Sequence, residues 1–245
     1  MRADWITPDW PAPARVHALS TTRQGGVSGG PFASLNLGEH VGDQPAAVAE
    51  NRRRLQQEIG AAQPRWLKQV HGTHVAKLEG AAVTEPADAA VTHRAGEACL
   101  IMTADCLPVL FCDREGTQVG AAHAGWRGLC AGVLEATVQA MGVAPAVMMA
   151  WMGPAIGADD YEVGDEVRQA FIAHAPQAAP AFKPGKAPGK WWCDLYVLAR
   201  LRLQAAGVKA IYGGGLSTAG DAKRFFSFRR DAGQTGRMAT LIYMK

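Results

Sequence analysis

Ala98-Cys99-Leu100-Ile101-Met102-Thr103-Ala104-Asp105-Cys106-Leu107-Pro108-Val109-Leu110-Phe111-Cys112 is the stretch of sequence that organises the chain. Two apolar runs of strand length enclose a short polar interruption, which ends at Cys106. Polar groups inside a buried run cost free energy unless they are used. We therefore predict strands over residues 98–102 and 108–112, separated by a functional break.

Strand and helix patterns alternate irregularly on both sides of this stretch. The patterns predict a helix over 45–60, a helix that follows Gly128 and ends at about Met141, a helix over 164–174 and a further helix that Asp194 caps. They predict strands over 15–21, 66–70, 74–78, 117–122, 147–152, 224–228 and 238–243, and a flexible surface loop over 175–190. This mixture without a strict βαβ repeat favours an α+β layered fold, and we expect residues 1–245 to form a single domain.

Composition excludes several classes of function. The net charge is +3 and the basic residues are scattered, which argues against nucleic acid as a partner. The first eight residues lack the apolar core of a signal peptide, and no apolar run approaches the ~18 residues of a membrane span. The five cysteines are odd in number and lack CxxC spacing, so we expect reduced thiols in a cytoplasmic protein.

Three side chains form the candidate site. His71 follows a predicted strand, Cys106 lies in the central break, and His123 ends the strand over 117–122. Two histidines and one cysteine match a catalytic zinc site, which keeps a fourth position for water or substrate. No local chelating spacing such as HExxH is present, so spacing alone permits this site without establishing it. We expect the other four cysteines to be small core residues.

A second feature is the glycine-containing turn from Gly125 to Gly128, where the predicted strand passes into a helix. Backbone N–H groups at such a turn attract anions, and Arg127 adds a positive charge. The alternative is that Gly125 and Gly128 only permit the turn.

Four longer motifs stand out along the chain. They are Lys68-Gln69-Val70-His71-Gly72, Thr103-Ala104-Asp105-Cys106-Leu107-Pro108-Val109, Ala122-His123-Ala124-Gly125-Trp126-Arg127-Gly128 and Arg224-Phe225-Phe226-Ser227-Phe228-Arg229-Arg230-Asp231. Together they strongly resemble the YfiH-like family, whose members are described as laccase-domain proteins, polyphenol oxidases or purine nucleoside phosphorylases. The resemblance extends from Ser20 to Met238.

This resemblance implies a four-layer α/β/β/α sandwich and a metal, usually zinc, on His71, Cys106 and His123. It implies phosphorolysis of adenosine, inosine, guanosine and methylthioadenosine, with adenosine deamination as a further activity. A zinc-activated water attacking C6 of adenine would account for the deamination. Some bacterial relatives are linked to the editing of peptidoglycan precursors that carry serine in place of alanine.

The remaining assignments follow from these motifs. We expect Asp105 in the catalytic set and Gln69, Gly125 and Arg127 at the substrate, with Arg23 and Arg52 as further candidates for holding phosphate. The partners are then a purine nucleoside and phosphate, and we expect a monomer. The family usually has Cys-Thr where this chain has Ser217-Thr218, and we expect this position only to line the pocket.

Two other functions stay open. A His₂Cys set also binds copper, so a copper-binding polyphenol oxidase is one alternative. The other histidines are scattered singly, which argues against the second cluster of a multicopper oxidase. The other alternative is a hydrolase acting on a cell-wall precursor, with Cys106 as nucleophile and His71 or His123 as base.

Overall fold

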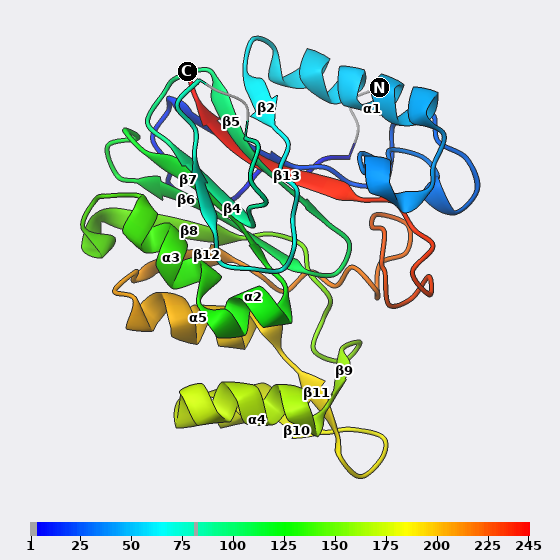
Figure 1. The fold of residues 1–245 in the computed structure, drawn as a ribbon, viewed down its shortest axis with the longest axis vertical. Helices are drawn as coiled ribbons and strands as arrows, with labels where there is room; N and C mark the ends of the chain where they lie inside the picture. The colour runs from blue at the N-terminus through cyan, green and yellow to red at the C-terminus, as the bar shows by residue number, and fades with distance from the viewer. Residues whose placement is uncertain (1–3, 81–82) are drawn as a thin grey trace.

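Two β-sheets stacked face to face form the centre of the molecule (Figure 1). The computed structural model describes residues 4–80 and 83–245, so three residues of the N-terminal stretch considered above lie outside it. The first sheet has the order β1-β13-β5-β2 and the second β12-β8-β6-β7-β4-β3. Their strands are β1 (Val16–Ser20), β2 (Gln63–Arg65), β3 (Val75–Lys77), β4 (Ala89–Thr92), β5 (Glu97–Thr103), β6 (Leu107–Asp113), β7 (Val119–Ala124), β8 (Met148–Met152), β12 (Ala210–Gly213) and β13 (Met238–Met244).

The organising stretch passes from one sheet to the other. Strand β5 belongs to the first sheet and β6 to the second, and every residue of both strands is buried. Residues 104–106 make the crossover between them. The predicted pair of strands with a break between them is therefore confirmed, and Cys106 lies in this break, directly before the first residue of β6.

Helices cover the outer face of each sheet. Helix α1 (Pro45–Ile59) packs Leu55 and Ile59 on the first sheet. Helices α2 (Trp126–Ala131), α3 (Val133–Ala140) and α5 (Leu195–Ala205) cover the second. Between the sheets, side chains such as Ile101 and Leu110 share one apolar cluster. The order helix, sheet, sheet, helix confirms the four-layer α/β/β/α fold.

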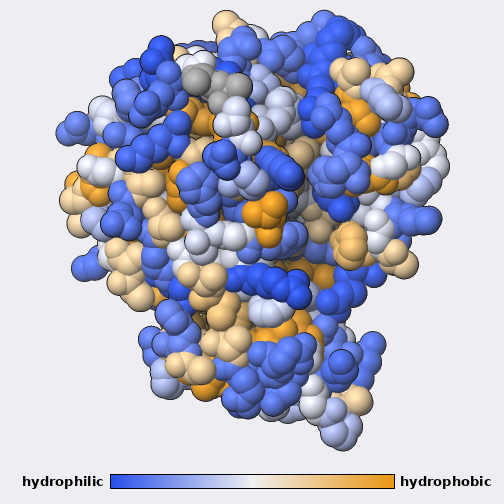
Figure 2. All heavy atoms as spheres, viewed as in Figure 1, coloured by the Kyte–Doolittle hydropathy of each residue, from blue (hydrophilic) through white to orange (hydrophobic). Residues whose placement is uncertain are grey.

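A smaller unit lies beyond the helix layer of the second sheet, at the bottom of Figure 1. It contains α4 (Asp165–His174) and a three-stranded sheet of β10 (Phe182–Pro184), β11 (Lys190–Cys193) and β9 (Glu162–Gly164). A flexible loop over 175–190 is therefore a wrong prediction, because 176–181 form a 3-10 helix and Phe182 packs in the core. Figure 2 shows this unit as a narrower lobe on a mostly hydrophilic surface.

Three other predicted elements differ from the structure. Residues 66–70 are not a strand, because the side chain of Gln69 takes the place of a strand partner by bonding both backbone groups of Met102. Residues 224–228 form turns rather than a strand. The helix expected after Gly128 already begins at Trp126 and breaks at Gly132, whose φ of 104° is left-handed.

No helix within residues 4–80 and 83–245 is long and apolar enough to cross a membrane.

Candidate metal centre and its pocket

His71, Cys106 and His123 meet at one point, although they come from three separate segments. Their ligand atoms all lie within 4.8 Å of one another, and the Sγ of Cys106 is 3.7 Å from Nε2 of His71. The register of β6 against β7 produces part of this convergence. Pro108 pairs with His123 and Leu107 with Ala124, so Cys106 lies at the end of the strand that neighbours the histidine.

The separation of Cys106 Sγ and His71 Nε2 fits two neighbouring donors of a tetrahedral metal ion. Metal–sulfur and metal–nitrogen bonds of about 2.3 and 2.1 Å at a tetrahedral angle separate the two donor atoms by about 3.6 Å. The observed separation between Cys106 Sγ and His71 Nε2 is 3.7 Å. Three soft and borderline donors with room for a fourth ligand suit zinc, and the same set also accepts copper.

A carboxylate that sequence reasoning missed holds both histidines. Asp88 is fully buried, and its Oδ1 lies 2.8 Å from Nδ1 of His123. The same carboxylate accepts hydrogen bonds from the backbone N–H groups of Val70, His71 and Gly72 at 2.7 to 3.2 Å. A proton on Nδ1 of His123 leaves Nε2 free as a metal donor, which is the usual role of such a carboxylate.

The surroundings favour the ionised form of Cys106, whereas a metal that binds His123 must displace the proton from its Nε2. Burial opposes ionisation of Cys106, but the nearby His123 and His71 lower the pKa of its thiol below the ordinary value. Burial likewise opposes the charged form of His123, but Cys106 and Asp88 raise its pKa overall. The thiolate is the form that binds metals, so the site presents Cys106 ready to act as a ligand.

Backbone conformation also marks this region. His71 has φ of 62° and Asp105 has φ of 89°, both in the left-handed range that side chains other than glycine rarely adopt. Such conformations persist where surrounding contacts fix them, and they cluster at functional sites. Gly125 supplies space, because a Cβ there would lie 2.7 Å from the His71 ring and 3.0 Å from Cys106 Sγ.

The cluster lines a pocket of about 660 Å³, within the size range of small-molecule sites. Aromatic side chains of Trp126, Tyr161 and Phe228 form part of its wall. The charged lining is almost entirely basic: Lys68, Arg127, Arg229 and Arg237, with His40 beside them. Asp105 is the one acidic residue among the lining side chains of the described chain.

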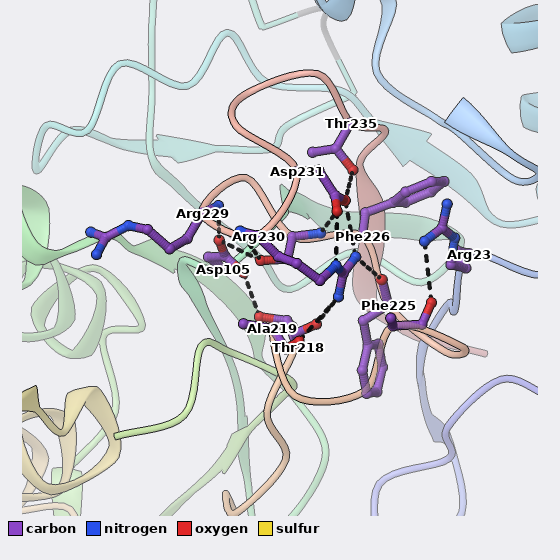
Figure 3. A network of polar contacts seen from close by, with 12 residues as sticks. Arg23, Asp105, Thr218, Ala219, Phe225, Phe226, Arg229, Arg230, Asp231 and Thr235 are labelled. Atoms are coloured by element: carbon purple, nitrogen blue, oxygen red, sulfur yellow. Dashed lines mark hydrogen bonds and ion pairs between the residues drawn. The ribbon is translucent and has the colours of Figure 1, made fainter. Parts of the chain in front are cut away.

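The carboxylate of Asp105 is occupied by structural contacts. It accepts hydrogen bonds from Thr218 Oγ1 at 2.6 Å, Ser227 Oγ at 3.0 Å and the backbone N–H of Arg229 at 2.7 Å. Figure 3 shows how these bonds tie the crossover to the loops that follow β12. Asp105 therefore anchors the pocket wall beside Cys106, and we propose a positioning role in place of the expected catalytic one.

The other expected binding residues lie in different places. Gln69 and Arg127 line the pocket, and the guanidinium of Arg127 stacks on Trp126 at 4.7 Å. Arg23 instead bonds the carbonyl oxygens of Ala33 and Ala222 and lies outside the pocket lining. Arg52 is also outside that lining and pairs with Glu39. The pocket thus offers no support for Arg23 or Arg52 as phosphate ligands.

Ser217, at the position where the resemblance implied a cysteine, takes part in three hydrogen bonds. Its hydroxyl donates to Asp160 at 2.5 Å and accepts from the backbone N–H groups of Gly157 and Gly220. It is absent from the residues that line the pocket, contrary to our expectation. A serine oxygen suits three short hydrogen bonds better than the larger sulfur of cysteine. In this chain, Ser217 therefore stabilises the loop that follows β12.

Sequence reasoning missed Asp88, Phe228 and Arg237. Asp88 carried a usable signal, since it is an isolated acid inside the apolar run 87–91, the same feature that singled out the central break. Phe228 lies in the motif Arg224–Asp231, which indicated the segment without giving this side chain a role, and Arg237 carried no signal, because single basic residues are common in loops.

Taken together, the fold and its His₂Cys cluster define a class of α/β/β/α protein with a candidate metal centre in a basic pocket. The profile of a family described as "Multi-copper polyphenol oxidoreductase laccase" matches residues 17–245. The chain belongs to this laccase-like family.

Curated relatives and solved structures agree with this assignment. A Pseudomonas aeruginosa protein named purine nucleoside phosphorylase PA4543 is 56% identical over 241 residues, covering 98% of both chains. Purine nucleoside phosphorylase YfiH of Escherichia coli is 52% identical with the same coverage. The crystal structure of Neisseria meningitidis protein NMB0706 superposes with a TM-score of 0.94 at 53% identity, covering 99% of each chain. YlmD from Geobacillus stearothermophilus has a TM-score of 0.92 at 35% identity, over 100% of this chain and 97% of its own.

Proposed function

We propose that this chain is a metal-dependent purine nucleoside phosphorylase and that residues 1–245 act as one catalytic domain. The observation that carries the proposal is the meeting of a His₂Cys cluster, aromatic walls and basic side chains in one pocket. The names of relatives that are 52 and 56% identical over 98% of the chain support it.

The pocket offers complementary surfaces to the two substrates. The faces of Trp126, Tyr161 and Phe228 suit the flat apolar rings of a purine. The basic lining suits inorganic phosphate, because guanidinium groups bind its oxygens through charge-assisted hydrogen bonds. Binding both partners in one pocket holds the phosphate near the sugar, which removes much of the entropic barrier to reaction.

Phosphorolysis then needs one displacement. A phosphate oxygen forms a bond to C1′ of the ribose as the bond from C1′ to purine N9 breaks. The electron pair stays on the base, which takes up a proton, and the sugar leaves as ribose 1-phosphate. His71, Cys106 and His123 would hold the metal, and a bound metal would supply Lewis-acid chemistry at the reacting end of the pocket.

We propose adenosine, inosine, guanosine and methylthioadenosine as substrates, with deamination of adenosine as a second activity. Zinc is the proposed metal and copper the alternative. Within the described residues, His71, Cys106 and His123 are the one group of three such donors that comes together, so the chain offers no support for the second copper cluster of a laccase.

Incubation of the purified protein with adenosine is expected to yield adenine and ribose 1-phosphate only when phosphate is supplied. The reason is that the basic pocket binds phosphate as the nucleophile. Mass spectrometry of the products with and without phosphate measures this, and inosine formation reports deamination separately. Free ribose as the sole sugar product, formed equally well without phosphate, would contradict phosphorolysis.

One observation favours a second candidate, a Cys–His hydrolase. Asp88, His123 and Cys106 follow one another as acid, imidazole and thiol, the arrangement that activates a cysteine nucleophile. Its proposed substrate is a peptidoglycan precursor that carries serine in place of alanine. This function requires a covalent adduct on Cys106 during turnover, which the metal-ligand assignment excludes.

A further inference from the structure

Arg237 occupies a fixed position beside the metal centre. It directly precedes β13, whose Met238 pairs with Thr103, so the antiparallel register places Arg237 next to the Thr103–Cys106 crossover. Its backbone N–H donates to Oδ1 of Asn36 at 2.9 Å, and its carbonyl accepts from the N–H of Leu37 at 3.1 Å. The side chain therefore starts from an anchored backbone and reaches the pocket lined by Cys106.

The guanidinium of Arg237 uses only part of its hydrogen-bond donors within the described protein. Its Nη1 donates to the carbonyls of Thr235 and Gly236, both at 3.0 Å. A guanidinium carries five N–H donors, so the three on Nε and Nη2 remain available to a ligand in the pocket. The carbonyl bonds orient the fork without neutralising its charge.

This half-buried cation lacks a carboxylate partner. Among the ion pairs of the described residues, none includes Arg237. Burial lowers its pKa, and the negative charges that oppose this effect are Cys106 and Asp105. Because Asp105 is already bonded to three donors, neither group serves as a dedicated counterion. A partly buried guanidinium without a carboxylate partner keeps its charge available for an anionic ligand.

The other basic side chains of the pocket are less suited to this task. Arg127, Arg229 and Lys68 are exposed, so water competes for their charges. Arg229 also donates to the carbonyl of Glu162 and stacks on Tyr161. Arg237 alone among these four combines partial burial, a fixed orientation and proximity to the crossover that bears Cys106.

We propose that Arg237 is the principal ligand of inorganic phosphate in this pocket, holding the anion next to the His71–Cys106–His123 cluster. The inference deepens the proposed function and rests on it. Arg237 lies over the ring of Phe228 at 5.7 Å, so the same residue would hold phosphate beside the aromatic wall proposed for the base.

The test compares Arg237→Met, which keeps the apolar stem, with Arg237→Lys, which keeps the charge. Arg53→Gln is the matched control, since it removes one positive charge from an exposed pair with Glu50 outside the pocket. We expect Arg237→Met to weaken binding of inorganic phosphate, measured by calorimetry without nucleoside, by at least about tenfold, as expected for a lost charge-assisted contact. Arg237→Lys should lose less, and Arg53→Gln should bind as the wild type.

The phosphate KM of phosphorolysis should rise in parallel, with metal content and unfolding temperature close to those of the wild type. If Arg237→Met binds phosphate as tightly as the wild type, or the wild type binds none, the proposal fails. If phosphorolysis is absent but calorimetry still shows loss of phosphate binding in Arg237→Met, the anion site stands and the proposed function fails. Should the methionine variant not fold, the lysine variant must still show weaker binding for the proposal to stand.

Discussion

Replacement of Cys106 by serine is expected to remove most of the bound metal and to lower kcat/KM for phosphorolysis by more than about a hundredfold. Loss of even an outer contact to a metal ligand costs about 10- to 100-fold in affinity or activity. A serine hydroxyl stays protonated at neutral pH and is a poor ligand, whereas the Cys106 thiol has a lowered pKa and ionises readily. Elemental analysis and steady-state kinetics of the two proteins measure the effect.

Alkylation of Cys106 gives an independent readout of the same assignment. A metal-bound thiolate is shielded, so iodoacetamide should label Cys106 slowly in the loaded protein and faster after chelation. Cys130→Ser is a suitable control, because Cys130 is half-buried and burial raises its pKa. Fast labelling of the loaded protein, unchanged metal in Cys106→Ser and a substrate adduct on Cys106 would instead support the Cys–His hydrolase.

Substitution of Asp88 by alanine is expected to weaken metal binding by about 10- to 100-fold and to destabilise the fold. The variant frees the ring of His123 and leaves the N–H groups of His71 and Gly72 without their acceptor. Each of these N–H groups loses a hydrogen bond to a charged acceptor, and such a bond contributes about 1.5–3 kcal/mol. The pKa of Asp88 is depressed, so its contribution is complete at neutral pH and is lost only as the pH falls through that lowered pKa.

Asp113→Ala is the matched control for Asp88. Asp113 is also a buried aspartate, and it accepts hydrogen bonds from Thr117 and Gln118 in a turn that lies outside the pocket lining. Its loss should lower the unfolding temperature without changing metal affinity. Equal metal affinity in Asp88→Ala and the wild type would show that Asp88 serves the fold alone.

The elements that could be predicted are those whose residue pattern lies within one short segment of sequence. The apolar runs around Cys106 predicted β5 and β6, and polar residues inside them marked the site. The same argument applied to Asp88 would have found the carboxylate that holds both histidines. The structure of residues 66–70 could not be predicted, because the side chain of Gln69 forms hydrogen bonds with the backbone of a distant strand. Alternation of apolar residues gives no information about such a contact.

Which residues line the pocket could be determined only from the three-dimensional fold. Arg23 and Arg52 were expected to hold phosphate, yet their guanidinium groups bond backbone carbonyls and Glu39. Arg237 is distant in sequence from all three donors, and the pairing of β13 with β5 brings it to the pocket that they line. Long-range strand register therefore determined which arginines line the pocket.

The central claim is that His71, Cys106 and His123 together bind one metal ion. Elemental analysis of the purified wild type, His71→Ala and His123→Ala tests it most directly, with the exposed His174→Ala as control. The account predicts about one zinc per chain in the wild type and in His174→Ala, and little in the other two variants. Equal metal in all four proteins would contradict it.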